Sequence, residues 1–223
     1  MKFTPLLFLT LFLTVSVFSQ RDSLQIGDKY WEDQLYIDVT YNLLANQPKQ
    51  LGETGFSYGV ALGYMKDIPF NKTGKTAFAV GLGYSHDSFS HGLKVLKGEV
   101  DSYEVASDII SNKIKLHNLE MPIQFRWRSS DANTYSFWRF YAGFKIVYNL
   151  SNSYIYQTSA DKTNFSNAAK FNTWQTGLTV SAGYGTFNFH VYYGLTPMFK
   201  GVKLNDEAIN SKVVRLGLSF YLL

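Results

Sequence analysis

Three adjacent residues, His86, Asp87 and Ser88, carry the side-chain types of a hydrolytic triad. Such a triad needs an imidazole that contacts both the carboxylate and the nucleophilic hydroxyl. In an extended strand, successive side chains point to opposite faces, so these three neighbours cannot converge on one substrate atom. We therefore predict no catalytic residues and no enzyme activity, and we keep a lipid-modifying enzyme as the least favoured alternative.

Metal ligation is the second chemistry that the histidines could support. His86 and His91 could share an ion with a carboxylate from the connection that follows them. Their spacing matches no characteristic ligand set, and the chain has no Cys that could supply a thiolate. We therefore predict no metal site and no cofactor.

Eight segments of two-residue alternation follow one another along the chain and must position all of these side chains. Alternation of apolar with other residues is the signature of β-strands. The segments span residues 35–43, 56–65, 77–85, 119–127, 138–148, 174–184, 187–193 and 214–222. The alternation therefore predicts an all-β fold.

The two phases of the alternation differ in size as well as in polarity. The apolar phase is bulky, whereas the other phase is rich in Gly, Ala and Ser, which are poor residues for a water-facing strand. Small residues suit the interior of a narrow barrel, where they leave room for long side chains from the opposite wall. The lipid-facing belt predicted in this way comprises Val39, Val60, Leu62, Val80, Leu82, Ile123, Ile146, Val180, Val191 and Leu218.

Aromatic residues occur at both ends of the apolar phase, and aliphatic residues occupy its middle. Two such girdles are expected where a barrel crosses the two interfaces of a membrane. The outer girdle would hold Tyr41, Phe56, Tyr58, Tyr84, Tyr148, Trp174 and Tyr193. The inner girdle would hold Tyr64, Phe78, Trp127, Trp138, Phe140, Tyr184, Phe187 and Phe220.

The connections between the segments alternate in length, which fixes the class of barrel. Longer connections fall at 45–54, 87–112, 150–171 and 196–210, and shorter ones at 67–75, 129–136 and Gly185-Thr186. Transmembrane barrels have long outer loops, short periplasmic turns and an even number of strands, which closes the sheet without a free edge. We therefore predict an eight-stranded antiparallel transmembrane outer-membrane β-barrel over residues 34–223.

Two stretches depart from regular strands. Pro122 lies in the middle of a segment, where it removes a donor from the ladder, so we predict a bulge at that residue. Residues 101–110, within the longest connection, are predicted to form a short helix on a partner-facing or solvated surface.

The inward phase carries several charges, and an eight-stranded barrel is only wide enough for its own side chains. We therefore expect no diffusion pore and keep an ion or proton path as the alternative. The predicted lumen charge network comprises Asp38, Glu120, Arg126, Arg139, Lys145, His190 and Arg215.

The pairing inside this network can be predicted from the segment register. A turn centred between residues 132 and 133 places Glu120 opposite Lys145, and Arg126 opposite Arg139. An unpaired buried charge is strongly unfavourable. We therefore predict one ion pair between Glu120 and Lys145. Across the closing seam we predict a second contact, between Asp38 and Arg215.

One end of the chain carries a predicted export signal, and the other carries a predicted membrane-assembly signal. Residues 1–19 predict a cleaved signal peptide, because the apolar run is too short to span a bilayer and Val17 and Ser19 suit the cleavage site. Residues 20–33 are then a periplasmic segment. The predicted assembly signal in the last strand, which resembles the one recognised by the barrel-assembly machinery, comprises Leu216, Leu218, Phe220 and Leu223.

The overall composition excludes a nucleic-acid partner. The formal net charge of +4 is spread along the chain, without the clustered Lys and Arg that nucleic-acid binding needs. Charged residues make up 17% of the chain, below the roughly 25% of an average soluble domain. A low charge fraction is consistent with a membrane protein.

Five stretches of the chain share the sequence character of one known family: DQLYIDVTYNLL (33–44), FSYGVALGYMKDIPFN (56–71), LEMPIQFRWR (119–128), FWRFYAGFKIVYNL (137–150) and VVRLGLSFYLL (213–223). They resemble the porin-like, or PorT-like, outer-membrane β-barrel family of Bacteroidota. The resemblance implies an integral protein of the cell outer membrane, with both termini periplasmic and the long loops extracellular. It also implies membership of a larger outer-membrane machine, for type IX secretion or for outer-membrane protein assembly.

The function predicted from the sequence is a non-enzymatic accessory or scaffolding subunit of such a machine. Its expected partners are outer-membrane lipid, the barrel-assembly machinery during insertion, and other outer-membrane proteins. The main alternative is a small ligand- or solute-binding barrel that acts through its extracellular loops. The two differ in an observable feature, because a binder needs a concave mouth lined by convergent polar groups.

Overall fold

The structure is a computed structural model that describes residues 33–48, 51, 55–71, 73–96, 102–105, 109–129, 137–158, 162–166, 170–204 and 207–222. Three sequence predictions lie outside the described residues. They are the signal peptide over 1–19, the periplasmic segment over 20–33 except for Asp33, and Leu223 of the assembly signal.

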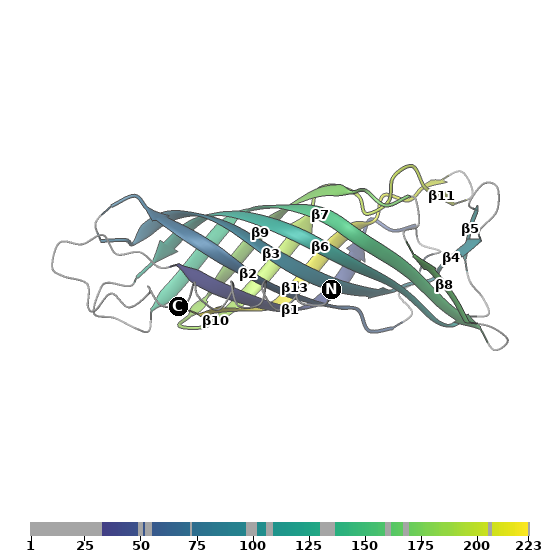
Figure 1. Cartoon of the computed structure of the whole chain (residues 1–223), viewed down its shortest axis with the longest axis horizontal. Helices are drawn as coiled ribbons and strands as arrows, with labels where there is room; N and C mark the ends of the chain where they lie inside the picture. Colours follow the sequence, from purple (N-terminus) through teal and green to yellow (C-terminus); the bar gives the residue numbers. More distant parts are fainter. Residues whose placement is uncertain are drawn as a thin grey trace, which may run out of the picture.

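Eight antiparallel strands close into a barrel, which confirms the predicted fold. Their bounds are β1 (Gln34–Ala45), β2 (Tyr58–Pro69), β3 (Thr76–Ser90), β6 (Ile109–Arg128), β7 (Trp138–Thr158), β9 (Trp174–Tyr184), β10 (Phe187–Gly194) and β13 (Lys212–Leu222). The ring runs β6-β3-β2-β1-β13-β10-β9-β7, and pairing of β6 with β7 closes it. Figure 1 shows these strands crossing the long axis of the molecule obliquely.

Short strands gather at one end of the barrel, which we call the cap end (Figure 1). There β4 (Leu93–Leu96) pairs with β5 (Ser102–Val105), β11 (Lys203–Leu204) pairs with β12 (Glu207–Ala208), and β8 (Lys162–Ser166) pairs with the far end of β7. The opposite end, which we call the turn end, carries the β2–β3, β6–β7 and β9–β10 connections. Within the described residues, no helix is long and apolar enough to cross a membrane.

The strand registers fix the diameter of the barrel. Followed from strand to strand around the ring, the register that leaves β1 at Gln34 returns to β1 at Leu44, a stagger of ten residues. A stagger of this size in an eight-stranded barrel tilts the strands by roughly 40° and leaves an interior just wide enough for side chains. The register therefore requires the lumen to be filled from the wall itself.

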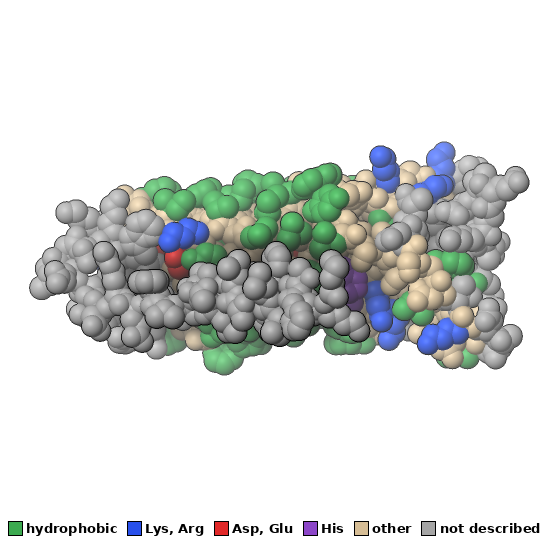
Figure 2. Space-filling model, in the orientation of Figure 1, with side chains coloured by type: hydrophobic (Ala, Val, Ile, Leu, Met, Phe, Trp, Pro, Cys, Tyr) green, Lys and Arg blue, Asp and Glu red, His purple; other side chains and the backbone are tan. Residues whose placement is uncertain are grey.

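The outward phase of each wall strand is apolar and exposed. All ten residues of the predicted belt lie on this face; Ile123 and Ile146 are half-buried, and the other eight are exposed. Figure 2 shows the resulting band of hydrophobic side chains along the middle of the molecule. The outward face of the terminal strand includes exposed Leu216 and Leu218 and half-buried Phe220, three residues of the predicted assembly signal.

Aromatic side chains contact one another at both edges of this band. At the cap end, the Tyr148 and Trp174 ring centroids lie 4.7 Å apart, and at the turn end those of Trp138 and Tyr184 lie 5.6 Å apart. The two-residue hairpin at the turn end is confirmed, because Tyr184 pairs with Phe187 and only Gly185 between them has positive φ, +58°. The two rims are thus formed by the aromatic residues that the alternation predicted.

The predicted bulge at Pro122 is wrong. Pro122 pairs with Lys145 in an unshifted register, and the register shifts of β6 lie elsewhere, one of them between His117 and Asn118. Proline lacks a backbone N–H, and the ladder to β3 is interrupted opposite it, at Gly81. The pairing then resumes in the same register. A Cβ on Gly81 would lie 3.1 Å from Pro122 Cγ, so the glycine makes room for the ring.

The predicted helix over 101–110 is also wrong. Residues 102–105 form β5, and β6 begins at Ile109. The strand that follows is longer than predicted because its alternation continues past the apolar belt with the phases exchanged. Inward Ile114 and Leu116 are buried, whereas outward Lys113 is exposed and Lys115 is half-buried. Water replaces lipid outside this part of the strand, so the apolar residues turn inward.

An apolar cluster, the cap core, closes the cap end of the barrel. Its members come from the wall strands and from the connections between them, and Tyr192 joins it to the lumen below. The cap core comprises Leu51, Phe89, Ile114, Leu116, Val147, Tyr154, Phe171, Tyr192, Met198, Phe199, Val202, Leu204, Ile209 and Val213. The described parts of the longer connections therefore pack around a core of their own.

We expect Val80→Arg and Leu218→Arg each to destabilise the barrel by about 2–4 kcal/mol, because an arginine that faces the bilayer midplane loses its hydration. The matched control is Ile110→Arg, which replaces an exposed aliphatic side chain at the cap end and should leave stability unchanged. The urea midpoint of unfolding in lipid vesicles measures the effect. Unchanged midpoints in both belt variants would show that the outward phase has been assigned to the wrong face.

Gly81→Arg is expected to prevent folding for a different reason. A Cβ at this position would lie 2.2 Å from Met65 Sδ and 2.6 Å from the Tyr64 carbonyl oxygen. The backbone oxygen cannot yield as a flexible side chain can. Failure to reach the heat-resistant folded form on a gel is the expected result, and a heat-resistant variant would contradict the close packing of the lumen.

Candidate functional site

A continuous chain of ion pairs occupies the middle of the lumen. Arg215 on β13 donates from Nη2 to Asp87 Oδ2 and from Nη1 to Glu120 Oε1, both at 2.7 Å. The second Glu120 oxygen accepts from Lys145 Nζ at 2.6 Å. Lys145 Nζ also lies 3.6 Å from Asp38 Oδ2. We call these five residues the lumen network; they come from β1, β3, β6, β7 and β13 and are all buried.

Neutral polar side chains satisfy the ends of the lumen network. Asn42 and Asn118 donate to the two oxygens of Asp87 at 2.8 and 3.1 Å. At the other end, Ser219 donates to Asp38, and His190 Nε2 lies 3.9 Å from the same carboxylate. Hydrogen bonds of this kind offset part of the cost of burying the charges.

A second charged group lies near the turn end. Asp67 accepts from Arg126 Nη1 at 3.3 Å and from Arg128 Nη2 at 2.8 Å, and none of the three side chains is exposed. The Arg126 guanidinium lies 4.6 Å from the centre of the Tyr141 ring. This turn-end cluster closes the lumen opposite the cap core.

The ion pair predicted between Glu120 and Lys145 is confirmed, but the predicted register is wrong by two residues. Glu120 stands opposite Val147, and Lys145 stands opposite Pro122. The long lysine side chain spans this diagonal. For the same reason Arg126 does not face Arg139; it faces Tyr141, and Arg139 instead donates to the Gly185 carbonyl oxygen.

The contact predicted between Asp38 and Arg215 is wrong. Asp38 pairs with Ser219 across the seam, and Arg215 pairs with Asn42, four residues further along β1. At about 3.3 Å per residue, this offset separates the two backbone positions by roughly 13 Å along the strand. Arg215 therefore reaches the carboxylates of Asp87 and Glu120 instead.

Three charged residues that complete the two clusters were missed from the sequence: Asp67, Asp87 and Arg128. Each lies on the inward phase, two residues beyond the last inward position that the predicted segment contains. Continuing the alternation by one more step would have found them. The segments were ended too early because their outward phase stopped being apolar near the rims.

Buried side chains fill the middle of the lumen in its described part. Two of its cavities measure about 10 Å³ each, the first lined in part by Tyr36, Lys145 and His190, and the second in part by Asp87 and Arg215. Each is about large enough for one water molecule. Buried side chains of the lumen network and the turn-end cluster fill the space between and below them.

His86 and Asp87 of the apparent triad point to opposite faces of β3, as predicted. His86 lies on the outward face, where its ring centroid is 4.6 Å from that of His117, whereas Asp87 points inward to Arg215. His91 is buried and packs edge-on against Tyr154 at 5.2 Å, so it does not meet His86. Among the described residues, no group of three or more His, Asp, Glu or Cys side chains is arranged to hold a metal ion.

We expect Glu120→Ala to destabilise the protein by about 3–5 kcal/mol, because it leaves Lys145 and Arg215 buried without their shared carboxylate. The matched control is Lys66→Ala, which removes an ion pair with Asp33 whose lysine is 50% exposed. Its expected cost is below about 1 kcal/mol. Urea unfolding in lipid vesicles separates the two, and equal effects would show that the lumen network is hydrated.

We expect the free energy of unfolding to depend on pH through His91 in the cap. Burial lowers the pKa of His91 to about 3, so the folded protein leaves this ring neutral where the unfolded chain protonates it. Above about pH 6.5 the ring is neutral in both states and does not affect the free energy of unfolding. Below that value the free energy of unfolding falls by about 1.4 kcal/mol per pH unit, because the unfolded chain binds a proton that the folded chain does not. The loss continues until the pH reaches the pKa of the folded protein.

His91→Phe keeps an aromatic ring against Tyr154 and removes the titration. Between about pH 7.5 and about pH 5, we expect the variant to lose roughly 2 kcal/mol less of its unfolding free energy than the wild type. Urea midpoints at the two pH values give the comparison. An identical pH dependence in both proteins would show that His91 is solvated.

Comparison with known proteins places the chain in a family. Residues 18–200 match the family described as outer membrane protein beta-barrel domain. Comparison with curated proteins yields no match. Among solved structures, the attachment invasion locus protein Ail of Yersinia pestis is 15% identical, with 86% of this chain and 99% of Ail covered and a TM-score of 0.33.

Two further solved structures give similar values. Ail in complex with the heparin analogue sucrose octasulfate is 13% identical, over 86% of this chain and 99% of that chain, with a TM-score of 0.32. A triple mutant of the porin of Rhodopseudomonas blastica is 9% identical, over 86% and 100%, with a TM-score of 0.22. With its closed eight-stranded wall and a family match over most of its length, this chain belongs to the outer-membrane β-barrel domain family and is an integral protein of the outer membrane.

Proposed function

We propose that this chain is a non-enzymatic, non-conducting scaffold and an accessory subunit of a larger outer-membrane assembly. The observation that carries the proposal is the occlusion of the barrel, by the lumen network inside it and by the cap core on top of it. A barrel whose lumen is occupied by its own side chains acts through its surfaces. The cap is its working surface; it faces the cell exterior, and both chain termini are periplasmic.

The filled lumen favours a scaffold over a solute-binding barrel. Small-molecule sites are concave and measure about 300–1,000 Å³. The two cavities beside the lumen network measure about 10 Å³ each, and ion-paired side chains separate them. Opening a path between them would break buried ion pairs, each of which is costly to leave without a partner.

The cap has the properties of a docking platform. Its core makes it rigid, and a rigid surface loses little conformational entropy when a partner binds. Ile110, Leu150 and Leu195 are exposed by 67%, 53% and 45%, beyond or at the cap-side rim of the apolar belt. These three aliphatic side chains offer a partner protein apolar surface to cover at the cap.

The resemblance of the strand stretches to PorT-like barrels supports a specific kind of assembly. It favours type IX secretion or outer-membrane protein assembly as the process in which the subunit acts. The separation of His86 from the inward Asp87 supports a non-enzymatic role, because this stretch brings no base to a nucleophile. The outer-membrane lipid and the barrel-assembly machinery remain the partners proposed for the belt and for insertion.

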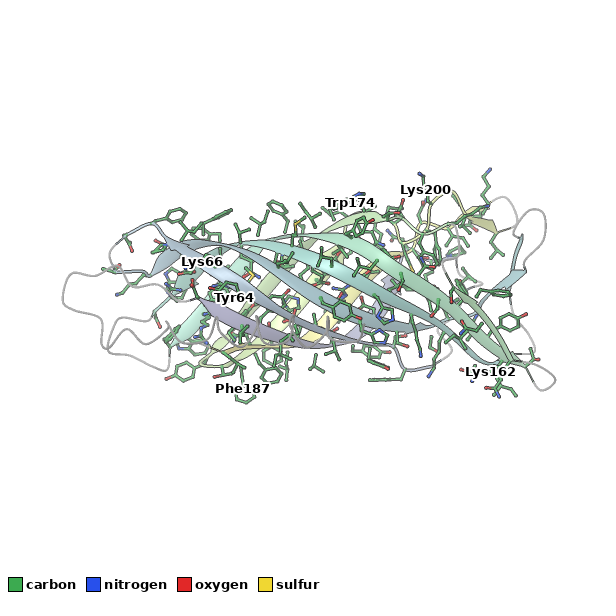
Figure 3. All side chains as sticks on the ribbon, viewed as in Figure 1. Tyr64, Lys66, Lys162, Trp174, Phe187 and Lys200 are labelled. Carbon is green, nitrogen blue, oxygen red and sulfur yellow. The ribbon has the colours of Figure 1, made fainter. Side chains whose placement is uncertain are left out.

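The absence of Cys from the chain allows a direct test, because a single introduced cysteine is the only thiol. Ile110→Cys and Lys200→Cys place it on the cap, and Lys66→Cys places a matched control at the turn end (Figure 3). On intact cells, a membrane-impermeant maleimide is expected to label the two cap variants and not Lys66→Cys. Labelling of Lys66→Cys alone would reverse the proposed orientation.

The same variants test the accessory-subunit role. A thiol-reactive cross-linker applied to cells should join the cap variants to a defined outer-membrane protein, which mild-detergent purification then recovers with the wild-type chain. Lys66→Cys should not give this cross-link. Recovery of an isolated barrel, without a cross-linked product from either cap variant, would contradict the proposal.

A further inference from the structure

Cationic and imidazole side chains replace apolar ones on the outward face just beyond the cap-side aromatic rim. The Tyr84–Leu119 rung is the last apolar pair of β3 and β6. The next outward rung pairs His86 with His117, and the rung after that brings Lys115. Figure 2 shows histidine and cationic side chains beside one edge of the hydrophobic band.

The two imidazoles are held in place by the aromatic rim. Their ring centroids lie 4.6 Å apart, and the Tyr84 hydroxyl bonds to His117 Nδ1. The Tyr58 ring packs edge-on against His86 at 6.4 Å. Because Tyr84 engages Nδ1, the second ring nitrogen of His117 is the one that can reach another partner.

This patch has no compensating acid on its own face within the described residues. Its basic members are His86, His117, Lys115 and exposed Lys113, which follows at the next outward position of β6. The neighbouring carboxylate, Asp87, points inward and is bound by Arg215. Lys113 and Lys115 are positively charged with no acid beside them on the described part of this face, so the patch is electrostatically complementary to an anion.

The position of the patch identifies the kind of anion. Aromatic girdles mark the level of the membrane–water interface, and lipid phosphates lie directly beyond it. Lysines placed at this level attract anionic headgroups. A soluble anion would have no reason to select a patch that borders the lipid-facing belt.

We propose that His86, His117, Lys115 and Lys113 form a binding site for the phosphate of an anionic glycolipid headgroup in the outer leaflet. The lysines supply the charge, and the two imidazoles supply donors in a fixed position at the rim. The placement in the outer leaflet rests on the proposed function, which sets the cap outside the cell. The recognition of the phosphate does not depend on that orientation.

The test uses the full barrel in detergent micelles and measures bound lipid by native mass spectrometry. The probes are a diphosphorylated lipid A, the same lipid after phosphatase treatment, and inorganic phosphate alone. We expect retention of the phosphorylated lipid, with binding weaker by about tenfold or more when Lys113→Gln and Lys115→Gln are combined. Inorganic phosphate at equal concentration should not displace the lipid, because the acyl chains also contact the belt.

Two further variants separate the site from general charge. His86→Gln with His117→Gln removes the imidazoles and should weaken binding several-fold. Lys200→Gln with Lys203→Gln removes the same charge elsewhere on the cap and should leave binding unchanged; resistance of the folded band to heating checks that every variant is folded. Equal binding by wild type and site variants, or equal loss in the Lys200 and Lys203 control, would overturn the proposal.

Two remaining outcomes are also decisive. Loss of lipid on addition of EDTA would show that a metal on the histidine pair, rather than the four side chains, holds the phosphate, and would overturn the proposal. The barrel could bind the lipid in micelles through its phosphate while its cap is not labelled on intact cells. That result would support the site and reject the proposed orientation.

Discussion

The ion pairs that join Arg215, Glu120 and Lys145 are the interaction on which the rest of this structure depends. They connect β13 to the paired strands β6 and β7, and Arg215 and Glu120 are 95 residues apart in the sequence. They also fill a lumen that the strand register leaves only as wide as its side chains. Removing any one partner leaves a buried charge, so the network fixes the register as well as the occlusion. The Tyr192 ring lies 4.7 Å from the Arg215 guanidinium and is also part of the cap core, so it links the lumen network to the cap.

A second constraint acts from outside the barrel, where lipid gives way to water along the same strands. Strand β6 is apolar outward at Leu119 and apolar inward at Leu116, and the change falls at the register shift beside His117. The wall thereby becomes the shell of a cap without any break in pairing. The same exchange produces the outward imidazoles and lysines, so the proposed headgroup site is a direct consequence of where the apolar belt ends.

These two constraints explain how much could be predicted from the sequence. Alternation was enough for the eight strands, for their outward faces and for the charged inward residues in the middle of each segment, because each depends only on the two-residue period. It missed Asp67, Asp87 and Arg128, where the outward phase stops being apolar. The pairing of Asp38 was mispredicted, because the partner of an inward charge depends on the stagger between strands, which alternation does not determine. The cap was mistaken for loops and a helix because its apolar phase is the inward one, opposite to the phase that defines the belt.

The central claim is that the cap is a rigid continuation of the barrel and not a set of loops over an open mouth. Hydrogen exchange of the backbone amides from Lys113 to His117, measured in lipid vesicles, tests it most directly. The account predicts that these amides are protected to about the same degree as those of the β6 belt between Leu119 and Phe125. Exchange at the rate of an unstructured peptide would show that the cap opens freely and would contradict the occluded scaffold.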